Sequence, residues 1–254
     1  MSVLDRFRLD GTVAIVTGAS SGLGVAFAQA LAEAGADVAL GARRVERLGE
    51  TAAMVEAIGR RSIVVATDVT KPEDCQRLVD ETMSAFGRVD TLVNNAGIGT
   101  AVPATRELPD DFRAVVDANL MGSYWMCQAC GRAMKPGSSI INIGSVLGLT
   151  TAGLPQAAYS ASKAAIVGLT RDLAQQWTGR KGIRVNAIAP GFFATEMTAA
   201  YPPDYIESQL VSRVLAGRIG ELEECATVVV FLASEAASYI SGIVLPVEGG
   251  ILTS

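Results

Sequence analysis

The chain has 254 residues, of which half are hydrophobic, and a formal net charge of −5. An acidic chain without a basic stripe is atypical of nucleic-acid-binding proteins, and no apolar run approaches the roughly 18 residues that a membrane span needs. The length fits one large α/β domain covering residues 1–254, and we expect no secretory signal because the first ten residues are polar. We therefore expect a cytoplasmic protein with neither a nucleic-acid nor a membrane partner.

Histidine is absent from the chain. Its absence excludes Ser-His-Asp hydrolysis, histidine-ligated metals and histidine acid/base catalysis, so any proton transfer must use Tyr, Lys, Cys or a carboxylate. Cys127 and Cys130 form a C-x-x-C pair inside a long helical pattern, where further zinc ligands are missing. We predict two buried thiols and no metal site.

Apolar, β-branched runs alternate with stretches of helical period along the chain. The predicted strands are residues 12–17, 37–40, 62–66, 91–93, 139–143, 184–188 and 243–247, and the predicted helices are residues 22–34, 45–58, 72–86, 110–134, 160–176 and 222–233. Pro72 is expected in the first turn of its helix, with Thr70 as the cap. Strict alternation of strands and helices predicts an α/β fold, a doubly wound and mostly parallel sheet covered on both faces.

One long irregular stretch, about residues 191–220, is expected to be a substrate loop, because loops of this length in compact domains are usually functional. Its aromatic and large apolar residues are expected to form an apolar substrate wall: Phe192, Phe193, Met197, Tyr201 and Tyr205. The alternative is ordinary surface packing of an amphipathic helix.

A glycine-rich turn follows the first predicted strand, with the spacing G-x-x-x-G-x-G at Gly18, Gly22 and Gly24. Gly18 permits a tight turn, Gly22 lets the backbone approach a pyrophosphate, and Gly24 lets helix and strand pack closely. The free N–H groups and the positive end of the following helix favour an anion. The turn therefore predicts a dinucleotide site.

The residue that follows the second strand bears on the choice of coenzyme. An acidic residue there would bind both ribose hydroxyls, but the chain has Ala42 followed by Arg43. A guanidinium at Arg43 suits a 2′-phosphate, which favours NADP(H), with NAD(H) as the alternative.

Tyr159 and Lys163 are four residues apart and share one face of a predicted helix. A neighbouring ammonium lowers the pKa of a tyrosine, which makes Tyr159 the candidate acid/base. Ser145, which follows the fifth strand, is placed to hydrogen-bond a substrate carbonyl. Asn119 lies within a helical pattern that its polar side chain is expected to interrupt, where it would hold a water.

With these motifs the sequence resembles the short-chain dehydrogenase/reductase family over essentially its whole length. The resemblance rests on residues 17–24, Asp68-Val69, residues 94–97, Asn119, Ser145, the Tyr159/Lys163 pair, Asn186 and Pro190-Gly191. It implies a seven-stranded Rossmann sheet and a catalytic tetrad of Asn119, Ser145, Tyr159 and Lys163, with Asn119 extending a proton relay from Lys163 through its water. It also implies a homotetramer or a homodimer.

The resemblance further implies a set of coenzyme-binding residues. These are Gly18, Ser20, Ser21, Gly22, Leu23, Gly24, Arg43, Asp68, Val69, Asn95, Ala96, Gly97, Tyr159, Lys163, Pro190, Gly191 and Thr195. Two departures from the family pattern stand out. The spacing from Ser145 to Tyr159 is one residue longer than the commonest one, and Ser21 replaces the basic residue of many NADP-preferring members.

The expected activity is interconversion of a ketone and a secondary alcohol by an NAD(P)(H)-dependent oxidoreductase. Segments 182–186 and 190–197 resemble bacterial 3-oxoacyl-thioester reductases and gluconate 5-dehydrogenases. The apolar loop after Gly191 favours the 3-oxoacyl-thioester reductase, and a sugar-acid or polyol dehydrogenase is the alternative. More remote alternatives are a non-catalytic nucleotide-binding protein and a hydrolase that uses Ser145 as nucleophile.

Overall fold

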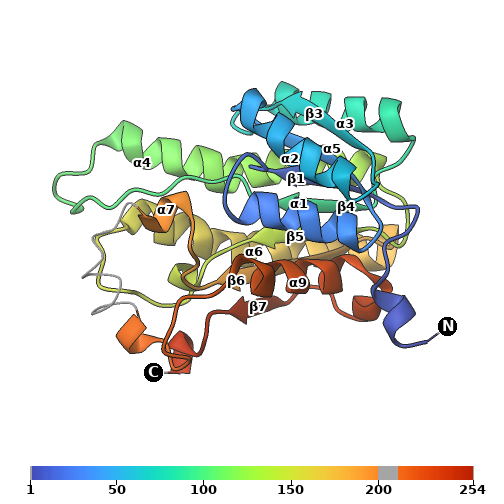
Figure 1. The fold of residues 1–254 in the computed structure, drawn as a ribbon. Helices are drawn as coiled ribbons and strands as arrows, with labels where there is room; N and C mark the ends of the chain where they lie inside the picture. The colour runs from blue at the N-terminus through green and yellow to red at the C-terminus, as the bar shows by residue number, and fades with distance from the viewer. Residues whose placement is uncertain (1, 200–210, 254) are drawn as a thin grey trace.

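The computed structural model describes residues 2–199 and 211–253. A seven-stranded sheet, parallel at every pairing, runs through its centre in the order β3-β2-β1-β4-β5-β6-β7 (Figure 1). The strands are β1 (Val13–Thr17), β2 (Asp37–Ala42), β3 (Ser62–Ala66), β4 (Thr91–Asn94), β5 (Ser139–Ile143), β6 (Arg184–Pro190) and β7 (Val244–Val247). The predicted doubly wound, seven-stranded parallel sheet is confirmed.

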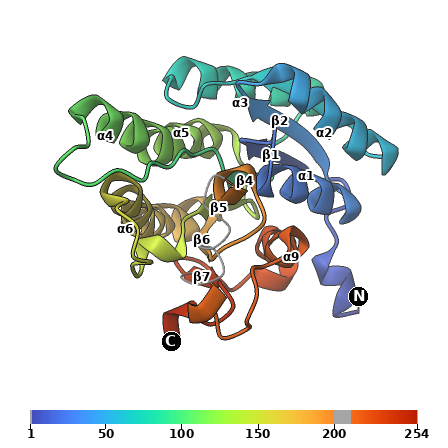
Figure 2. The ribbon, with the colours of Figure 1, turned by 60° about the vertical axis from the view of Figure 1, so that its left-hand side comes forward.

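Helices cover both faces of the sheet. They are α1 (Leu23–Glu33), α2 (Val45–Ala57), α3 (Pro72–Phe86), α4 (Pro109–Val116), α5 (Gly122–Ala133), α6 (Ala157–Lys181), α7 (Glu196–Ala199) and α9 (Leu222–Ala233). Short 3-10 turns lie at Leu4–Phe7, Val146–Gly148, Val211–Arg213, Glu235–Ala237 and Ile251–Thr253. Figure 2 shows α1 and α9 on one side of the sheet and α5 and α6 on the other.

Successive residues of a strand pack into two separate hydrophobic cores, one on each face of the sheet. On β1, Ala14 and Val16 pack with α1, α2 and α9, whereas Ile15 packs with α3, α5 and α6. This follows from the period of two in a strand, which sends successive side chains to opposite faces. Because both faces are covered, β1 is buried along its whole length and reads in the sequence as a continuous apolar run.

The order of the strands reverses between β1 and β4, because the chain builds outward from β1 in one direction and from β4 in the other. Ligands of open α/β sheets bind at such a switch point, outside the carboxyl ends of the strands. Thr17 at the end of β1 is joined to the segment after β4. Its Oγ1 accepts hydrogen bonds from the backbone N–H groups of Asn95 (3.0 Å) and Ala96 (3.1 Å). The end of β1 and the segment after β4 are therefore joined at the carboxyl edge of the sheet.

One local prediction is confirmed and another is wrong. The helical pattern over residues 110–134 is interrupted at Asn119, as its polar side chain predicts, by a π-helical turn at Asp117–Met121 that lies between α4 and α5. Thr70 does not cap α3: its N–H and hydroxyl donate to the Asp68 carboxylate (3.1 and 2.8 Å), and the residue before the helix is Lys71. Pro72 does begin α3, as predicted.

Cys127 and Cys130 are buried and form no disulfide, as expected for packing residues. Burial raises the pKa of the Cys127 thiol to about 12, which keeps it protonated. Within residues 2–199 and 211–253, no group of three or more metal-ligating side chains is found. Over the same residues, no helix combines the length and the apolar character needed to cross a bilayer.

Candidate active site

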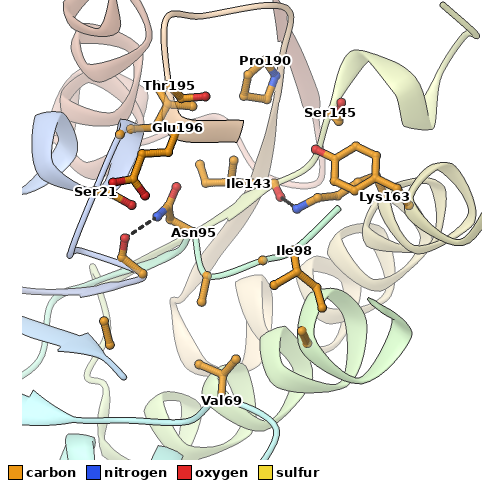
Figure 3. Close-up of a pocket in the computed structure, with 18 of the residues that line it drawn as sticks. Ser21, Val69, Asn95, Ile98, Ile143, Ser145, Lys163, Pro190, Thr195 and Glu196 are labelled. Atoms are coloured by element: carbon orange, nitrogen blue, oxygen red, sulfur yellow. Dashed lines mark hydrogen bonds between the residues drawn. The ribbon is translucent and has the colours of Figure 1, made fainter. Parts of the chain in front are cut away.

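A cavity of about 590 Å³ opens at the carboxyl edge of the sheet, over the point where the strand order reverses. It is lined by every site residue predicted from the sequence except Gly24 and Asn119. Figure 3 shows its lining side chains converging from the turn after β1, the segment after β4, β5, α6 and the segment after β6. One cavity therefore joins the predicted dinucleotide site to the predicted proton-transfer site.

The glycine-rich turn has the shape that the spacing predicts. Gly18 (φ 65°) and Gly22 (φ 55°) lie in the left-handed region, where a side chain would be strained. A Cβ at Gly24 would lie 2.2 Å from the Gly18 carbonyl oxygen, so Gly24 serves helix packing and does not line the cavity. Helix α1 begins at Leu23, and the first N–H groups of a helix have no acceptor within it. The turn therefore fits an anionic diphosphate.

We expect Gly24→Ala to lower the free energy of unfolding by about 2 to 3 kcal/mol, because an overpacked site must shift backbone atoms. Gly49 in the middle of α2 is the matched control, since a Cβ there meets nothing within 4 Å. Gly49→Ala should raise stability by about 0.5 to 1 kcal/mol, the ordinary gain for a helix interior. Urea unfolding of both variants measures the difference. Equal stability of the two variants would contradict the close packing at Gly24.

Lys163 on α6 is buried at the inner end of the cavity. Its Nζ donates a hydrogen bond to the Ile143 carbonyl oxygen (2.8 Å), as Figure 3 shows. The same Nζ lies 5.7 Å from the centre of the Tyr159 ring. Burial lowers the pKa of Lys163 to about 8, because a charged amine loses its hydration. The ammonium therefore still forms at neutral pH, close to the ring of Tyr159.

Ser145 immediately follows β5 and faces the same space. Its Oγ accepts a hydrogen bond from the Leu147 N–H (3.1 Å), which fixes the side chain in a cap of the short turn Val146–Gly148. A hydroxyl that accepts in this way still has its own proton to donate. Ser145 can therefore donate to an oxygen atom in the cavity.

Asn119 does not line the cavity, and its amide is occupied by protein atoms. The side-chain oxygen accepts from the Ile98 N–H (2.8 Å), and Nδ2 donates to the Ile98 carbonyl (2.9 Å) and to Ser162 Oγ (3.0 Å). These bonds tie the segment after β4 to α6, next to Lys163. The water that Asn119 is expected to hold stays a prediction.

The far end of the cavity lies over the end of β2. Arg43 lines it, is exposed and makes no hydrogen bond or ion pair to any described residue. The predicted aromatic wall is present in part, because Phe192 and Phe193 are buried and line the cavity. The Met197 side chain, Tyr201 and Tyr205 lie outside the described part of the structure.

The sequence did not single out Arg44, Glu196 or Gln156 as site residues, yet all three line the cavity. Arg44 had a signal, since it stands beside Arg43 after β2. Gln156 had a weaker signal, its position three residues before Tyr159. The structure adds that its side chain is buried at the start of α6. Glu196 had none: its partners Arg44 and Arg47 are about 150 residues away in sequence.

Comparisons with known proteins agree with this geometry. A family model described as enoyl-(acyl carrier protein) reductase matches residues 18–252. The 3-oxoacyl-[acyl-carrier-protein] reductase of Thermotoga maritima is 38% identical, covering 96% of this chain and 99% of its own. The 2-dehydro-3-deoxy-D-gluconate 5-dehydrogenase of Escherichia coli is also 38% identical, covering 98% and 99%.

Among solved structures, a gluconate 5-dehydrogenase from Burkholderia cenocepacia, in complex with NADP and tartrate, superposes with a TM-score of 0.93. It is 36% identical, and the match covers both chains completely. The chain belongs to the short-chain dehydrogenase/reductase family. It is an oxidoreductase of the class that acts on CH–OH groups, as the sequence predicts.

Proposed function

We propose that the protein interconverts a ketone and a secondary alcohol, with Tyr159 as the acid/base and Asn119, Ser145 and Lys163 as its partners. The observation that carries the proposal is the meeting of Ser145, Tyr159 and Lys163 in one cavity with a glycine-rich turn. The nicotinamide coenzyme, when bound, supplies or accepts the hydride. The protein's own residues then have to orient the substrate and move one proton.

The path of the proton follows from the chemistry of the Ser145, Tyr159 and Lys163 side chains. During reduction Tyr159 gives its phenolic proton to the substrate oxygen, and Ser145 donates a hydrogen bond that stabilises the negative charge developing on that oxygen. The tyrosinate left behind is stabilised by the Lys163 ammonium, a charge that a buried site screens little. Oxidation of the alcohol reverses each of these steps.

The proposed coenzyme is NADP(H), with NAD(H) as the alternative. Three features of the cavity support a dinucleotide: the left-handed Gly18 and Gly22, the unsatisfied N–H groups at the start of α1, and the length of the cleft from β2 to α6. Support for the phosphorylated form comes from Arg43, whose guanidinium has no partner among the described residues, and from the lack of an acid at Ala42.

For the substrate we propose a 3-oxoacyl thioester. Leu147 and Phe192 line the cavity and belong to the buried apolar cluster against which Tyr159 packs, which suits an acyl chain. The second candidate is a sugar acid or polyol. It is favoured by Gln156, a buried amide that lines the same region and is able to hydrogen-bond a hydroxyl next to the reacting carbon.

The test is a panel of substrates followed by nicotinamide absorbance. Acetoacetyl-coenzyme A, 5-ketogluconate and a cyclic ketone would each be offered with NADPH and with NADH. We expect kcat/KM for the thioester to exceed that for the keto acid by at least about tenfold, since an apolar wall discriminates by roughly 1 to 3 kcal/mol. The reverse order would identify the sugar-acid activity. Coenzyme binding without turnover of any substrate would leave a non-catalytic nucleotide-binding protein.

A homotetramer or homodimer and a cytoplasmic location remain predictions. Light scattering of the purified chain tests the first.

A further inference from the structure

The segment that follows β6 is joined to the start of α2 by charged side chains across the mouth of the cavity. Glu196, the first residue of α7, accepts a hydrogen bond from Arg44 (Nη1 to Oε2, 3.1 Å) and a second one from Arg47. Both arginines come from the turn after β2 and the first turn of α2. Glu196 and Arg44 both line the cavity, and Figure 3 shows Glu196 beside Ser21.

Arg44 is fully engaged on both sides. Besides Glu196, its guanidinium donates to Ser21 Oγ (2.6 Å) and to Ser20 Oγ (3.3 Å), both in the glycine-rich turn. In contrast, Arg43 beside it has no described partner. The two adjacent arginines therefore differ: one is free, and the other already holds an anion.

The carboxylate is held in position by its own segment. Thr198 Oγ1 donates to the Phe193 carbonyl (2.6 Å) and accepts from the Thr195 N–H (2.9 Å), which closes a tight turn around Glu196. Thr195 also lies against the glycine-rich turn, since a Cβ at Gly22 would be 3.3 Å from its Cγ2. Hydrogen bonds from Arg47 and Arg44 hold the pKa of Glu196 below its ordinary value, so it is a carboxylate at neutral pH.

We propose that Glu196 is a coenzyme-discriminating residue, whose carboxylate competes with the 2′-phosphate of NADP(H) for Arg44 and Arg47. This inference rests on the proposed binding of a nicotinamide coenzyme in the cavity. A 2′-phosphate at the end of β2 would be a second anion beside guanidinium groups that Glu196 already occupies. Either the carboxylate leaves or the two anions repel each other, and both cost binding free energy only for the phosphorylated coenzyme.

The pairs are suited to such competition. Both arginine side chains and the Glu196 side chain are about half exposed, and exposed ion pairs are weak enough to be exchanged for a doubly charged phosphate. NADH has a 2′-hydroxyl in place of the phosphate, so it leaves the Arg44–Glu196 pair in place. Glu196 therefore lowers the preference for NADP(H) that Arg43 would otherwise give, and it is not a catalytic residue.

The test is the dissociation constant of each coenzyme, measured by the fluorescence of bound NADPH and NADH for the wild type, Glu196→Gln and Glu46→Gln. We expect Glu196→Gln to tighten NADPH binding about tenfold and to leave NADH binding within about twofold, since it removes one like charge from the phosphate site. Glu46 is the matched control: it lies on α2 next to Arg47, carries the same charge and does not line the cavity. Glu46→Gln should leave the ratio of the two constants unchanged.

Other outcomes overturn the inference. If Glu196→Gln weakens both coenzymes equally, the residue only anchors its segment. An unchanged ratio, or an equal gain from Glu46→Gln, also contradicts competition at Arg44. If the wild type binds both coenzymes and the variants give any of these results, this inference alone is refuted. If the wild type binds neither coenzyme, the proposed function and this inference are refuted together.

Discussion

Replacement of Tyr159 by phenylalanine should lower kcat by about 10³-fold for every substrate that the protein turns over, while coenzyme affinity stays within about threefold. The phenolic oxygen is the only part that is removed, so the ring keeps its place beside Lys163. General acid/base catalysis contributes roughly 10² to 10⁴ to the rate, and the chain has no histidine that could take over the proton. Initial rates and fluorescence titration of the coenzyme measure the two quantities separately.

Tyr239 supplies the control for this variant, because its side chain is fully exposed and does not line the cavity. Tyr239→Phe should keep the kcat of the wild type. Turnover by Tyr159→Phe at more than about a tenth of the wild-type rate would remove Tyr159 from the mechanism. A parallel loss of coenzyme affinity would instead indicate that the substitution has disturbed the cavity.

The parts of the fold that follow local rules could be predicted from the sequence. The apolar run Val13–Thr17 reads as a strand buried on both faces, and the glycines after it read as a tight turn before a helix. Each of these depends on residues that are neighbours in the chain. The position of Ser145 at the cavity was also predictable, because Ser145 follows β5 and parallel strands end at one edge of the sheet.

What could not be predicted depends on contacts between distant segments. The polar Asn119 predicts an interruption of the helical pattern, but its partners Ile98 and Ser162, which hold the π-helical turn, are distant in sequence and could not be predicted. Similarly, two arginines after β2 are visible in the sequence, but the one already bound to Glu196 is not. Sequence periodicity carries no information on a pairing of charges across about 150 residues.

Lys163→Met should strongly lower activity and stabilise the coenzyme-free protein at the same time. Loss of the ammonium removes the charge that stabilises the tyrosinate, so we expect kcat to fall about 10³-fold. Burial lowers the pKa of Lys163 from 10.5 to about 8, which means that charging this amine costs roughly 3 kcal/mol at pH 7. Loss of the bond to the Ile143 carbonyl offsets about 1 kcal/mol, so the free energy of unfolding should rise by about 2 kcal/mol.

The dependence on pH identifies the cause of this gain. Between about pH 8 and 10.5 the unfolded wild type binds a proton that the folded protein does not, so the stability of the wild type rises with pH across this window. The methionine variant lacks the amine, and its advantage in stability should therefore be largest below pH 8 and fade toward pH 10.5.

Lys181, on the same helix, is the control: it also donates to a carbonyl, that of Gly131 (2.7 Å), but it is exposed. Lys181→Met should change stability by less than about 1 kcal/mol at any pH and leave kcat intact. A Lys163→Met protein less stable than the wild type at pH 7 would show that the buried ammonium is stabilised by the fold and is not a cost that the active site imposes on it.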